Sequence, residues 1–255
     1  MITERTRGLV LDAFIDVITW DQAVERLLAW GRARESRYVA ICNVHVVVSA
    51  SQDANYLGVI NGADMATPDG APIAWMLRRQ GNVKQQRICG PDLMWVLCER
   101  CAAENLPVYF YGSTEPTLQV LGHRLSQAFP GLVIGGMESP PFRVQTVEED
   151  RVSVDRINAC EAGVVFVGLG CPKQERWMSE HRGRVNAVMI GVGAAFDFHA
   201  GKVTRAPKWM RENGLEWLHR LFSEPRRLWR RYLVTNSLFI LGAAKQLLLG
   251  VKVGR

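Results

Sequence analysis

The 255-residue sequence predicts an α/β fold with a mostly parallel sheet that is covered by helices on both faces. Short β-rich runs alternate with helical stretches almost throughout the chain. The apolar runs VVFVGLG and AVMIGVG are too continuous for strands with one solvated face, so we expect them at the centre of the sheet. With 48% hydrophobic and 22% charged residues, the composition excludes a disordered protein and a small disulfide-stapled module.

The expected strands are short apolar segments bounded by turn-forming or helical sequence. In chain order they are residues 8–19, 38–43, 64–67, 107–112, 132–136, 163–170 and 187–193. The expected helices carry apolar residues at helical spacing and begin at residues suited to N-capping, such as Asp21 and Ser113. In chain order they are residues 21–33, 71–80, 90–105, 113–129 and 146–162.

Basic residues are concentrated at the end of the chain. The formal net charge is +6, yet residues 1–201 carry −3, because twelve Lys/Arg and only three Asp/Glu follow from Lys202 onward. An anionic partner is therefore expected to bind the last fifth of the chain. We divide the sequence accordingly into an α/β core, residues 1–201, and a basic, amphipathic C-terminal appendage, residues 202–255.

The appendage contains the longest apolar run, residues 233–244, which is too short for a bilayer core that needs about 20 residues. The basic and aromatic stretch PRRLWRRYL precedes it, as in a helix that lies in a membrane interface. A helix docked on the protein's own core has the same pattern, and the two interpretations are compatible. The opening residues MITERTRGLV lack the features of a secretory signal, so a cytosolic location is expected.

The six cysteines are expected to be free and mostly buried. Cys98 and Cys101 form a CxxC, but they fall inside a helical pattern with no second pair and no nearby His to complete a zinc set. The five histidines are scattered, and no D-x-D pair occurs. The sequence therefore predicts neither a divalent metal nor another cofactor.

Four Gly-bearing segments follow expected strands and lead towards helices. They are residues 66–70, 110–114, 168–175 and 191–201. Ligands of open α/β sheets bind beyond the carboxyl ends of the strands, so these segments predict a phosphate or nucleotide cleft. A dinucleotide fingerprint is not complete, because Lys173 and Phe196 occupy the third glycine positions after Gly168-x-Gly170 and Gly191-x-Gly193.

Several polar residues of these segments are candidates for chemistry. Asp69 in TPDG is a candidate general base, although an Asp there can also cap the helix that follows. Lys173 and Gln174 begin a helix after a buried strand, where a cation and an amide suit a phosphate and a sugar or base edge. Asp197 can accept from a uracil-type N–H or cap a turn, and Arg87 brings a cation to another loop.

A leaving diphosphate would need positive charge, which arginines can supply where no metal does. The appendage offers Arg220, Arg226, Arg227, Arg230 and Arg231. On one continuous helix, the first, third and last of these would share a face. A basic face turned to solvent or to a membrane is the alternative meaning of such a run.

Together these segments resemble glycosyltransferase family 26, the WecG/TagA/CpsF family of bacterial surface-polysaccharide enzymes. The matching motifs, in the family's order from about Gly8 to about Tyr232, are ATPDGAPIAW, RICGPDL, VFVGLGCPKQERW, GVGAAFDFHAGKVTRAPKW and GLEWLHRLFSEPRRLWRRYL. The resemblance implies a Rossmann-like α/β domain with a small N-terminal β element and a C-terminal helical appendage. It also implies an inverting, metal-independent transfer of a sugar from a UDP-sugar donor to a polyprenyl-diphosphate-linked saccharide at the cytoplasmic face of the membrane.

The resemblance assigns roles to individual residues. Asp69 corresponds to the proposed general base, and Arg87, also a catalytic candidate, corresponds to the Arg of RxxGxD and is expected to offset charge on the leaving diphosphate. In the donor site, Gln174 is the Gln of PKQE, next to Lys173, and Asp197 meets the uracil beyond Gly193. The arginines that close over the donor diphosphate correspond to Arg220, Arg227 and Arg230.

Asn43 corresponds to an Asn that follows the early strand in the family, and we expect Asn43 and His45 to contact the acceptor. Many relatives read TPN after the early strand, whereas this chain reads Ile41-Cys42-Asn43, so a Thr hydroxyl is missing. The transferred sugar therefore stays open among mannosaminyl, mannosaminuronyl and glucosyl groups. The resemblance also allows a homo-oligomer when the appendage is displaced.

Two other functions are compatible with the same residues. A non-catalytic scaffold that binds a nucleotide sugar or a lipid diphosphate would use the same cations, but it has no need of a base such as Asp69. A nucleic-acid binder would use the basic appendage, but Trp217, Trp229 and Tyr232 recur at a helical spacing better suited to packing or membrane contact, so no nucleic-acid partner is expected.

Overall fold

The computed structural model describes residues 5–249. Two compact units make up the chain, and each is formed by segments that are distant in sequence. The first comprises the residues up to Trp20, Ile41–Cys89 and the residues from Thr204 onward. The second comprises Asp21–Ala40 and Gly90–Val203.

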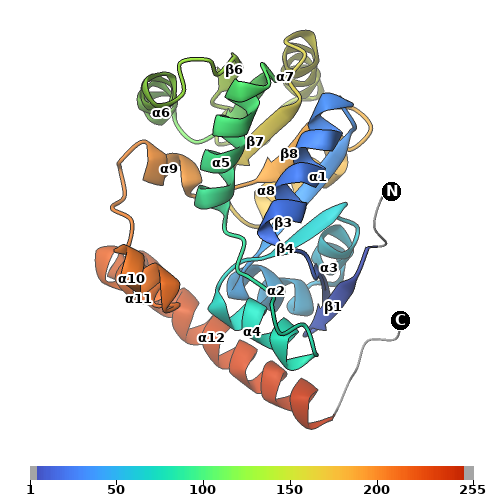
Figure 1. Cartoon of the computed structure of the whole chain (residues 1–255), viewed down its shortest axis with the longest axis vertical. Coiled ribbons are helices and arrows are strands. Elements are labelled where there is room, and N and C mark those ends of the chain that lie inside the picture. Colours follow the sequence, from blue (N-terminus) through green and yellow to red (C-terminus); the bar gives the residue numbers. More distant parts are fainter. Residues whose placement is uncertain (1–4, 250–255) are drawn as a thin grey trace. The chain divides into compact units, whose positions relative to one another are not determined.

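A six-stranded sheet, in the order β4-β3-β8-β7-β5-β6, confirms the predicted α/β class (Figure 1). Its pairs β3–β8, β8–β7, β7–β5 and β5–β6 are parallel. β7 and β8 are interior strands and almost entirely buried, as their continuous apolar sequences predict. The strands are β3 (Arg37–Cys42), β4 (Met65–Pro68), β5 (Val108–Gly112), β6 (Ile134–Glu138), β7 (Val164–Gly168) and β8 (Val188–Gly191).

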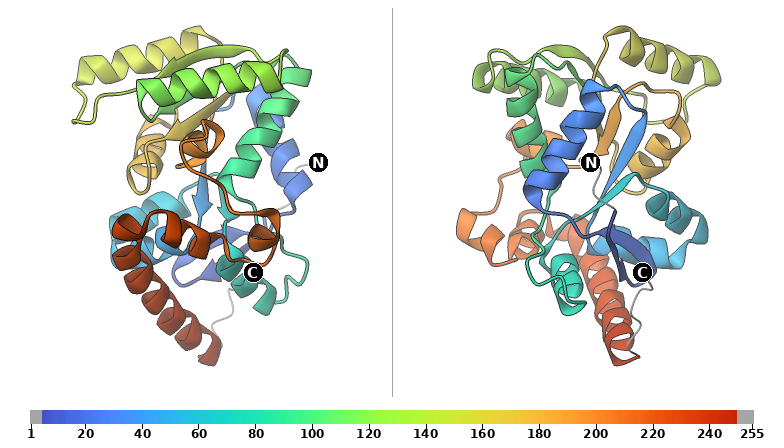
Figure 2. Two further views of the ribbon diagram at one scale, coloured as in Figure 1. Left: turned by 90° about the vertical axis from the view of Figure 1, so that its left-hand side faces the viewer. Right: turned by 45° about the vertical axis from the view of Figure 1, so that its right-hand side comes forward.

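Helices of the second unit cover both faces of its strands. α8 packs against β7 and β8, while α6 and α7 contact the edge strand β6. Figure 2 shows α1 and α5 on the opposite side of these strands from α8. The helices are α1 (Trp20–Arg32), α5 (Gly90–Ala103), α6 (Glu115–Ala128), α7 (Val147–Ala159), α8 (Lys173–His181) and α9 (Ala195–His199).

Aromatic packing closes the core of the second unit near the strand ends. The Phe110 ring lies 5.3 Å from that of Phe166 and 5.7 Å from that of Phe196, between ring centroids. A Cβ atom on Gly168 would come within 2.8 Å of the Phe196 ring, so only glycine fits there. Phe196, which breaks the dinucleotide fingerprint, is thus a core residue. Cys98 and Cys101 are free and buried in α5, as predicted.

The first unit begins with a β hairpin, which confirms the small N-terminal β element. Strands β1 (Arg7–Val10) and β2 (Ala13–Asp16) pair in antiparallel register. The Asp16 carboxylate at the end of the hairpin is buried and accepts hydrogen bonds from Arg5 and, at 2.6 Å, from the Ala66 backbone of β4. The unit also contains α2 (Val44–Gln52), α3 (Ala54–Asn61), α4 (Ala71–Arg79), α10 (Lys208–Glu212), α11 (Glu216–Ser223) and α12 (Pro225–Leu248).

The long helix α12 docks on its own unit through one face. That face buries Leu228 and Phe239 and packs against α2. Gln246 joins it to the hairpin, because its side chain accepts from the Leu11 amide at 2.9 Å and donates to the Leu9 carbonyl at 2.7 Å. The docked interpretation of the C-terminal segment is therefore confirmed. Within residues 5–249, every helix falls short of the length and apolarity needed to span a bilayer.

The basic run of the appendage does not form one continuous helix, so the prediction of a shared face for Arg220, Arg227 and Arg231 was wrong. Arg220 lies on α11, which ends at Ser223, whereas the other two lie on α12, which starts at Pro225. Glu224 between them has φ −134° and ψ 55°. Proline disfavours helical conformation in the residue before it, which explains the break.

Candidate active site

The carboxyl ends of three neighbouring strands meet at one edge of the second unit. Gly112 of β5 is in register with Gly168 of β7, and Val167 of β7 is in register with Gly191 of β8. These strands are parallel, so the segments that follow them emerge on the same side. Those segments contain the Lys173–Gln174 pair and the Gly193–Asp197 stretch, as the sequence predicts.

The donor-site candidates of the second unit differ in exposure. Lys173 is exposed at the first position of α8, where its ammonium group and the helix N-terminus both favour an anion. Gln174 is buried, accepts from the Gly170 amide at 3.2 Å and donates to Glu175 at 2.7 Å. Asp197 lies in α9 and is partly exposed, after the turn that contains Gly193.

In the first unit, Asp69 follows β4 directly and is held in place by its backbone. Its amide donates to the Cys42 carbonyl at the end of β3 at 2.9 Å. The segment that carries Arg87 runs alongside, because the Ile88 amide donates to the Pro68 carbonyl at 2.9 Å. α4 begins after Gly70 with no side-chain cap, so Asp69 does not serve as the N-cap of that helix.

The environment of Asp69 favours a carboxyl group that can gain and lose a proton. Burial raises its pKa to about 6, against the lowering effect of the nearby Arg87 guanidinium. This value also includes smaller effects: Glu216 raises the pKa, whereas the Gly70 amide and Arg220 lower it. A base with this pKa is charged at pH 7.5 and is still strong enough to take a proton in a transition state.

Arg87 is surrounded by groups from two parts of the first unit. Its Nη1 lies 3.0 Å from an Oε of Glu216, the first residue of α11, and its Nη2 lies 3.3 Å from the Cys89 sulfur. Arg205 reaches the same carboxylate at 3.6 Å and the same sulfur at 3.6 Å. Two guanidinium groups therefore share one carboxylate beside Asp69.

A tight turn brings α11 to this place. Gly214, just before α11, has φ +72°, a conformation that favours glycine. A Cβ atom at this position would lie 2.7 Å from the Cβ of Ala71, the first residue of α4. The close approach of these two backbones brings Glu216 and Arg220 near Asp69.

The appendage arginines Arg227 and Arg230 are more exposed than Arg220 and lie on α12. Arg220 is mostly buried and lies 4.0 Å from Glu224, which also pairs with Arg227. The Arg227 side chain is 61% exposed, and Arg230 lies over the exposed ring of Trp229. The structure thus brings Arg220 to the neighbourhood of Asp69 and leaves Arg227 and Arg230 on the outer part of α12.

Asn43 and His45 lie at the start of α2, after β3. Asn43 is the N-cap, and its Oδ1 accepts from the Val46 amide at 3.2 Å. His45 lies within hydrogen-bonding range of Ser49, with 3.4 Å between Nδ1 and Oγ. Burial, and to a smaller extent the charge of Arg231, lower its pKa to about 4. A contact between His45 and an acceptor would therefore use a neutral ring at physiological pH.

Sequence reasoning missed Arg205, Glu216 and Cys89. Arg205 and Glu216 lie in the motifs GKVTRAPKW and GLEWL, so their positions within the matching segments were a usable signal. Their grouping with Arg87 depends on the turn at Gly214 and was not visible in the chain order. Within residues 5–249, no group of three or more His, Cys, Asp or Glu side chains has the arrangement of a metal site.

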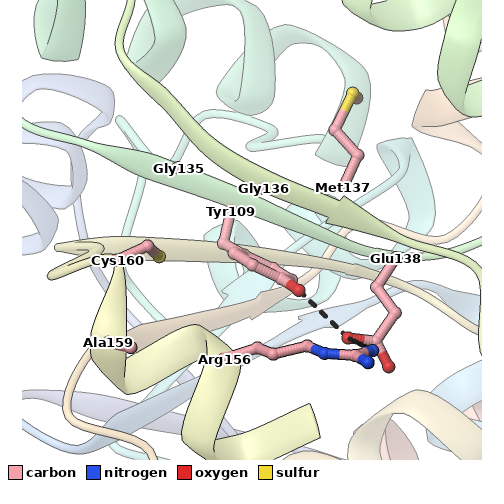
Figure 3. Close-up of a pocket in the computed structure, with 8 residues that line it drawn as sticks. All are labelled: Tyr109, Gly135, Gly136, Met137, Glu138, Arg156, Ala159 and Cys160. Carbon is pink, nitrogen blue, oxygen red and sulfur yellow. Dashed lines mark hydrogen bonds and ion pairs between the residues drawn. The ribbon is translucent and has the colours of Figure 1, made fainter.

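A pocket of about 490 Å³ lies elsewhere in the second unit, between β6 and the end of α7 (Figure 3). Its polar side chains pair with one another: Tyr109 donates to Glu138 at 3.0 Å, and Arg156 lies 3.7 Å from the same carboxylate. Ser153 also donates to Glu138. None of the residues selected from the sequence lines this pocket.

Comparison with known proteins gives consistent matches. Residues 9–252 match the family model described as "Glycosyl transferase WecG/TagA/CpsF family". The chain is 32% identical over 197 residues to the N-acetylglucosaminyldiphosphoundecaprenol N-acetyl-beta-D-mannosaminyltransferase of Bacillus spizizenii, which covers 77% of this chain and 74% of the relative. It is 30% identical over 196 residues to the protein of the same name from Bacillus subtilis, a match that covers 76% of this chain and 74% of that relative.

Proposed function

Because the chain belongs to the WecG/TagA/CpsF family of glycosyltransferases, we propose that it transfers a sugar from a UDP-sugar to a polyprenyl-diphosphate-linked saccharide, with inversion and without a metal. The observation that carries this proposal is the partly buried Asp69, with its pKa raised to about 6, next to Arg87 at the end of β4. A general base and a cation at one strand end are what such a transfer requires. The product would serve bacterial cell-surface or exopolysaccharide assembly.

The proposed reaction begins with proton transfer to Asp69. The carboxylate takes the proton from an acceptor hydroxyl, and the oxygen attacks the anomeric carbon from the face opposite the UDP group. The bond between that carbon and the diphosphate oxygen breaks, and UDP leaves. Arg87 and Arg220 offset the negative charge that develops on the diphosphate, and Arg227 and Arg230 close over it from α12.

The second unit is proposed to hold the donor nucleotide. Lys173 at the start of α8 suits a phosphate, and Asp197 suits a base N–H group. Gln174 is proposed to hold the loop against the donor, since its amide already fixes the Gly170 backbone at 3.2 Å. Asn43 and His45, at the start of α2 in the first unit, are proposed to contact the acceptor.

The names of the relatives suggest the first compounds to test. Both relatives are named for transfer of N-acetylmannosamine to N-acetylglucosaminyldiphosphoundecaprenol. The test measures UDP release from a panel of UDP-sugars, with and without a short-chain prenyl-diphosphate GlcNAc acceptor and with EDTA present. Acceptor-dependent release from one donor, undiminished by EDTA, is expected. Loss of release in EDTA would contradict the metal-free mechanism.

The alternative is a non-catalytic scaffold that binds a nucleotide sugar or a lipid diphosphate. It predicts UDP binding with no UDP release from any donor, whether or not the acceptor is present. Slow hydrolysis of a donor without acceptor would exclude it. The raised pKa of Asp69 favours the enzyme, because burying a carboxylate costs free energy and a scaffold gains nothing from it.

We further propose that the outer face of α12 binds the membrane that holds the acceptor. Arg226 and Leu233 lie on this exposed face, which continues through Ile240 at 65% and Leu241 at 68% exposure. Each basic residue near an anionic leaflet contributes about 1 kcal/mol, and exposed leucine and isoleucine side chains add apolar contact.

Replacing Ile240 and Leu241 together by Ser is expected to weaken binding to anionic liposomes about tenfold, because it removes apolar contact without disturbing the docked face. Co-sedimentation with vesicles that contain phosphatidylglycerol measures this. Val83→Ser is the control, since Val83 is 80% exposed in the same unit but lies outside α12. Equal sedimentation of all three proteins would contradict membrane binding through this face.

A further inference from the structure

The appendage contains only three acidic residues, and two of them form ion pairs with arginines. From Lys202 onward the acidic residues are Glu212, Glu216 and Glu224. Glu212 makes an exposed pair with Lys208 within α10 at 3.7 Å. Glu216, in contrast, is 17% exposed and contacts Arg87 and Arg205, whereas Glu224 contacts Arg220 and Arg227. Three of the cations expected to meet a diphosphate, Arg87, Arg220 and Arg227, are therefore already paired with carboxylates of the appendage itself.

Glu216 is an unusual neighbour for the proposed reaction centre. It lies beside Asp69 and makes ionisation of that carboxyl less favourable. A diphosphate brought to Arg87 would meet a second negative charge at 3.0 Å from the same guanidinium. Like charges at such distances repel strongly in a partly buried site, so Glu216 and a diphosphate cannot both hold Arg87 and Arg205 favourably.

We propose that Glu216 is an internal competitor of the diphosphate: it occupies Arg87 and Arg205 in the donor-free protein and gives them up when a diphosphate binds. The proposal deepens the function given above and rests on it for the identity of the diphosphate. It also adds Arg205 to the residues that bind this group. The same competition helps UDP to leave after transfer, because the carboxylate can return to the two arginines.

The test measures the binding of UDP and of inorganic pyrophosphate to the full-length protein by titration calorimetry. Glu216→Gln keeps the shape of the side chain and removes its charge, so both ligands should bind about fivefold more tightly. Glu216→Asp, which keeps the charge, should bind both within about twofold of the wild type. Glu212→Gln is the matched control, since it removes one charge from the same appendage outside the site, and it should have no effect beyond about twofold.

Unchanged or weaker pyrophosphate binding by Glu216→Gln would overturn the proposal, because Glu216 would then be neutral or would hold Arg87 in its binding position. No pyrophosphate binding by any variant would overturn it as well. If Glu216→Gln does not fold, Arg205→Gln replaces it and should weaken pyrophosphate binding about fivefold, and an unchanged affinity would contradict the proposal. Failure of the proposed function gives a different result: UDP binds no more tightly than pyrophosphate, while Glu216→Gln still strengthens pyrophosphate binding.

Discussion

Asp69→Asn is expected to lower kcat for sugar transfer about a thousandfold while it changes the Kd for UDP by less than about threefold. The amide cannot take the proton of the acceptor hydroxyl, yet it keeps the size of the side chain and an oxygen that can accept from the Gly70 amide. Steady-state kinetics and UDP titration on the same preparation measure both quantities. Asp12→Asn, in the exposed turn of the hairpin, is the control. Turnover at the wild-type rate would rule out Asp69 as the base.

The same variant should be more stable than the wild type at pH 8. The folded-state pKa of Asp69, about 6, lies above the ordinary value of 3.8, so the folded protein binds this proton more tightly than the unfolded chain does. The carboxyl therefore lowers stability as the pH rises from about 4 to about 6, and the cost stays constant above that range. Asp69→Asn should gain about 2 kcal/mol of unfolding free energy at pH 8 and almost none at pH 4. Denaturant unfolding at both pH values tests this.

Arg87→Ala is expected to lower kcat/KM for the donor by about two to three orders of magnitude and to weaken UDP binding at least tenfold. The Arg87 side chain is only 18% exposed, and its guanidinium serves both Asp69 and the proposed diphosphate site. Arg87→Lys should recover part of the binding but less of the rate, because an ammonium group lacks the planar fork. Arg79→Ala, at the exposed end of α4, is the control.

Loss of Arg87 should also change the pH dependence of the transfer rate. Its charge lowers the pKa of Asp69, so its removal should move the acidic limb of any remaining activity to higher pH. A limb that stays in place or moves to lower pH would show that Arg87 does not act on the base. A merely structural role would reduce the amount of folded protein without moving the limb.

Much of the second unit could be predicted from the sequence because its elements follow local patterns. The continuous apolar runs at residues 163–170 and 187–193 contain β7 and β8, and α7 begins after Thr146, which forms a capping box with Glu149. Lys173 begins α8 as the sequence predicts. Strand ends that carry glycine, and helices that start after them, are signals that do not depend on distant segments.

The first unit was less predictable because tertiary contacts determine its structure. The valine-rich segment Val44–Gln52 has a sequence that favours a strand, yet it forms α2, which Asn43 caps and against which α12 packs. Asp69 was recognisable from TPDG, but Glu216, which pairs with Arg87 beside it, lies almost 150 residues further along the chain. The turn at Gly214 helps to bring that carboxylate to Arg87.

The pH dependence of acceptor-dependent UDP release tests the central claim, that Asp69 is the base of a sugar transfer, most directly. The wild type should have a kcat/KM that falls about tenfold for each pH unit below about 6, because the carboxyl must be charged to accept the proton. Above that value the rate should reach a plateau, and the residual activity of Asp69→Asn should lack this limb. A wild-type rate that stays constant down to pH 4.5, or the same limb in both proteins, would contradict the claim.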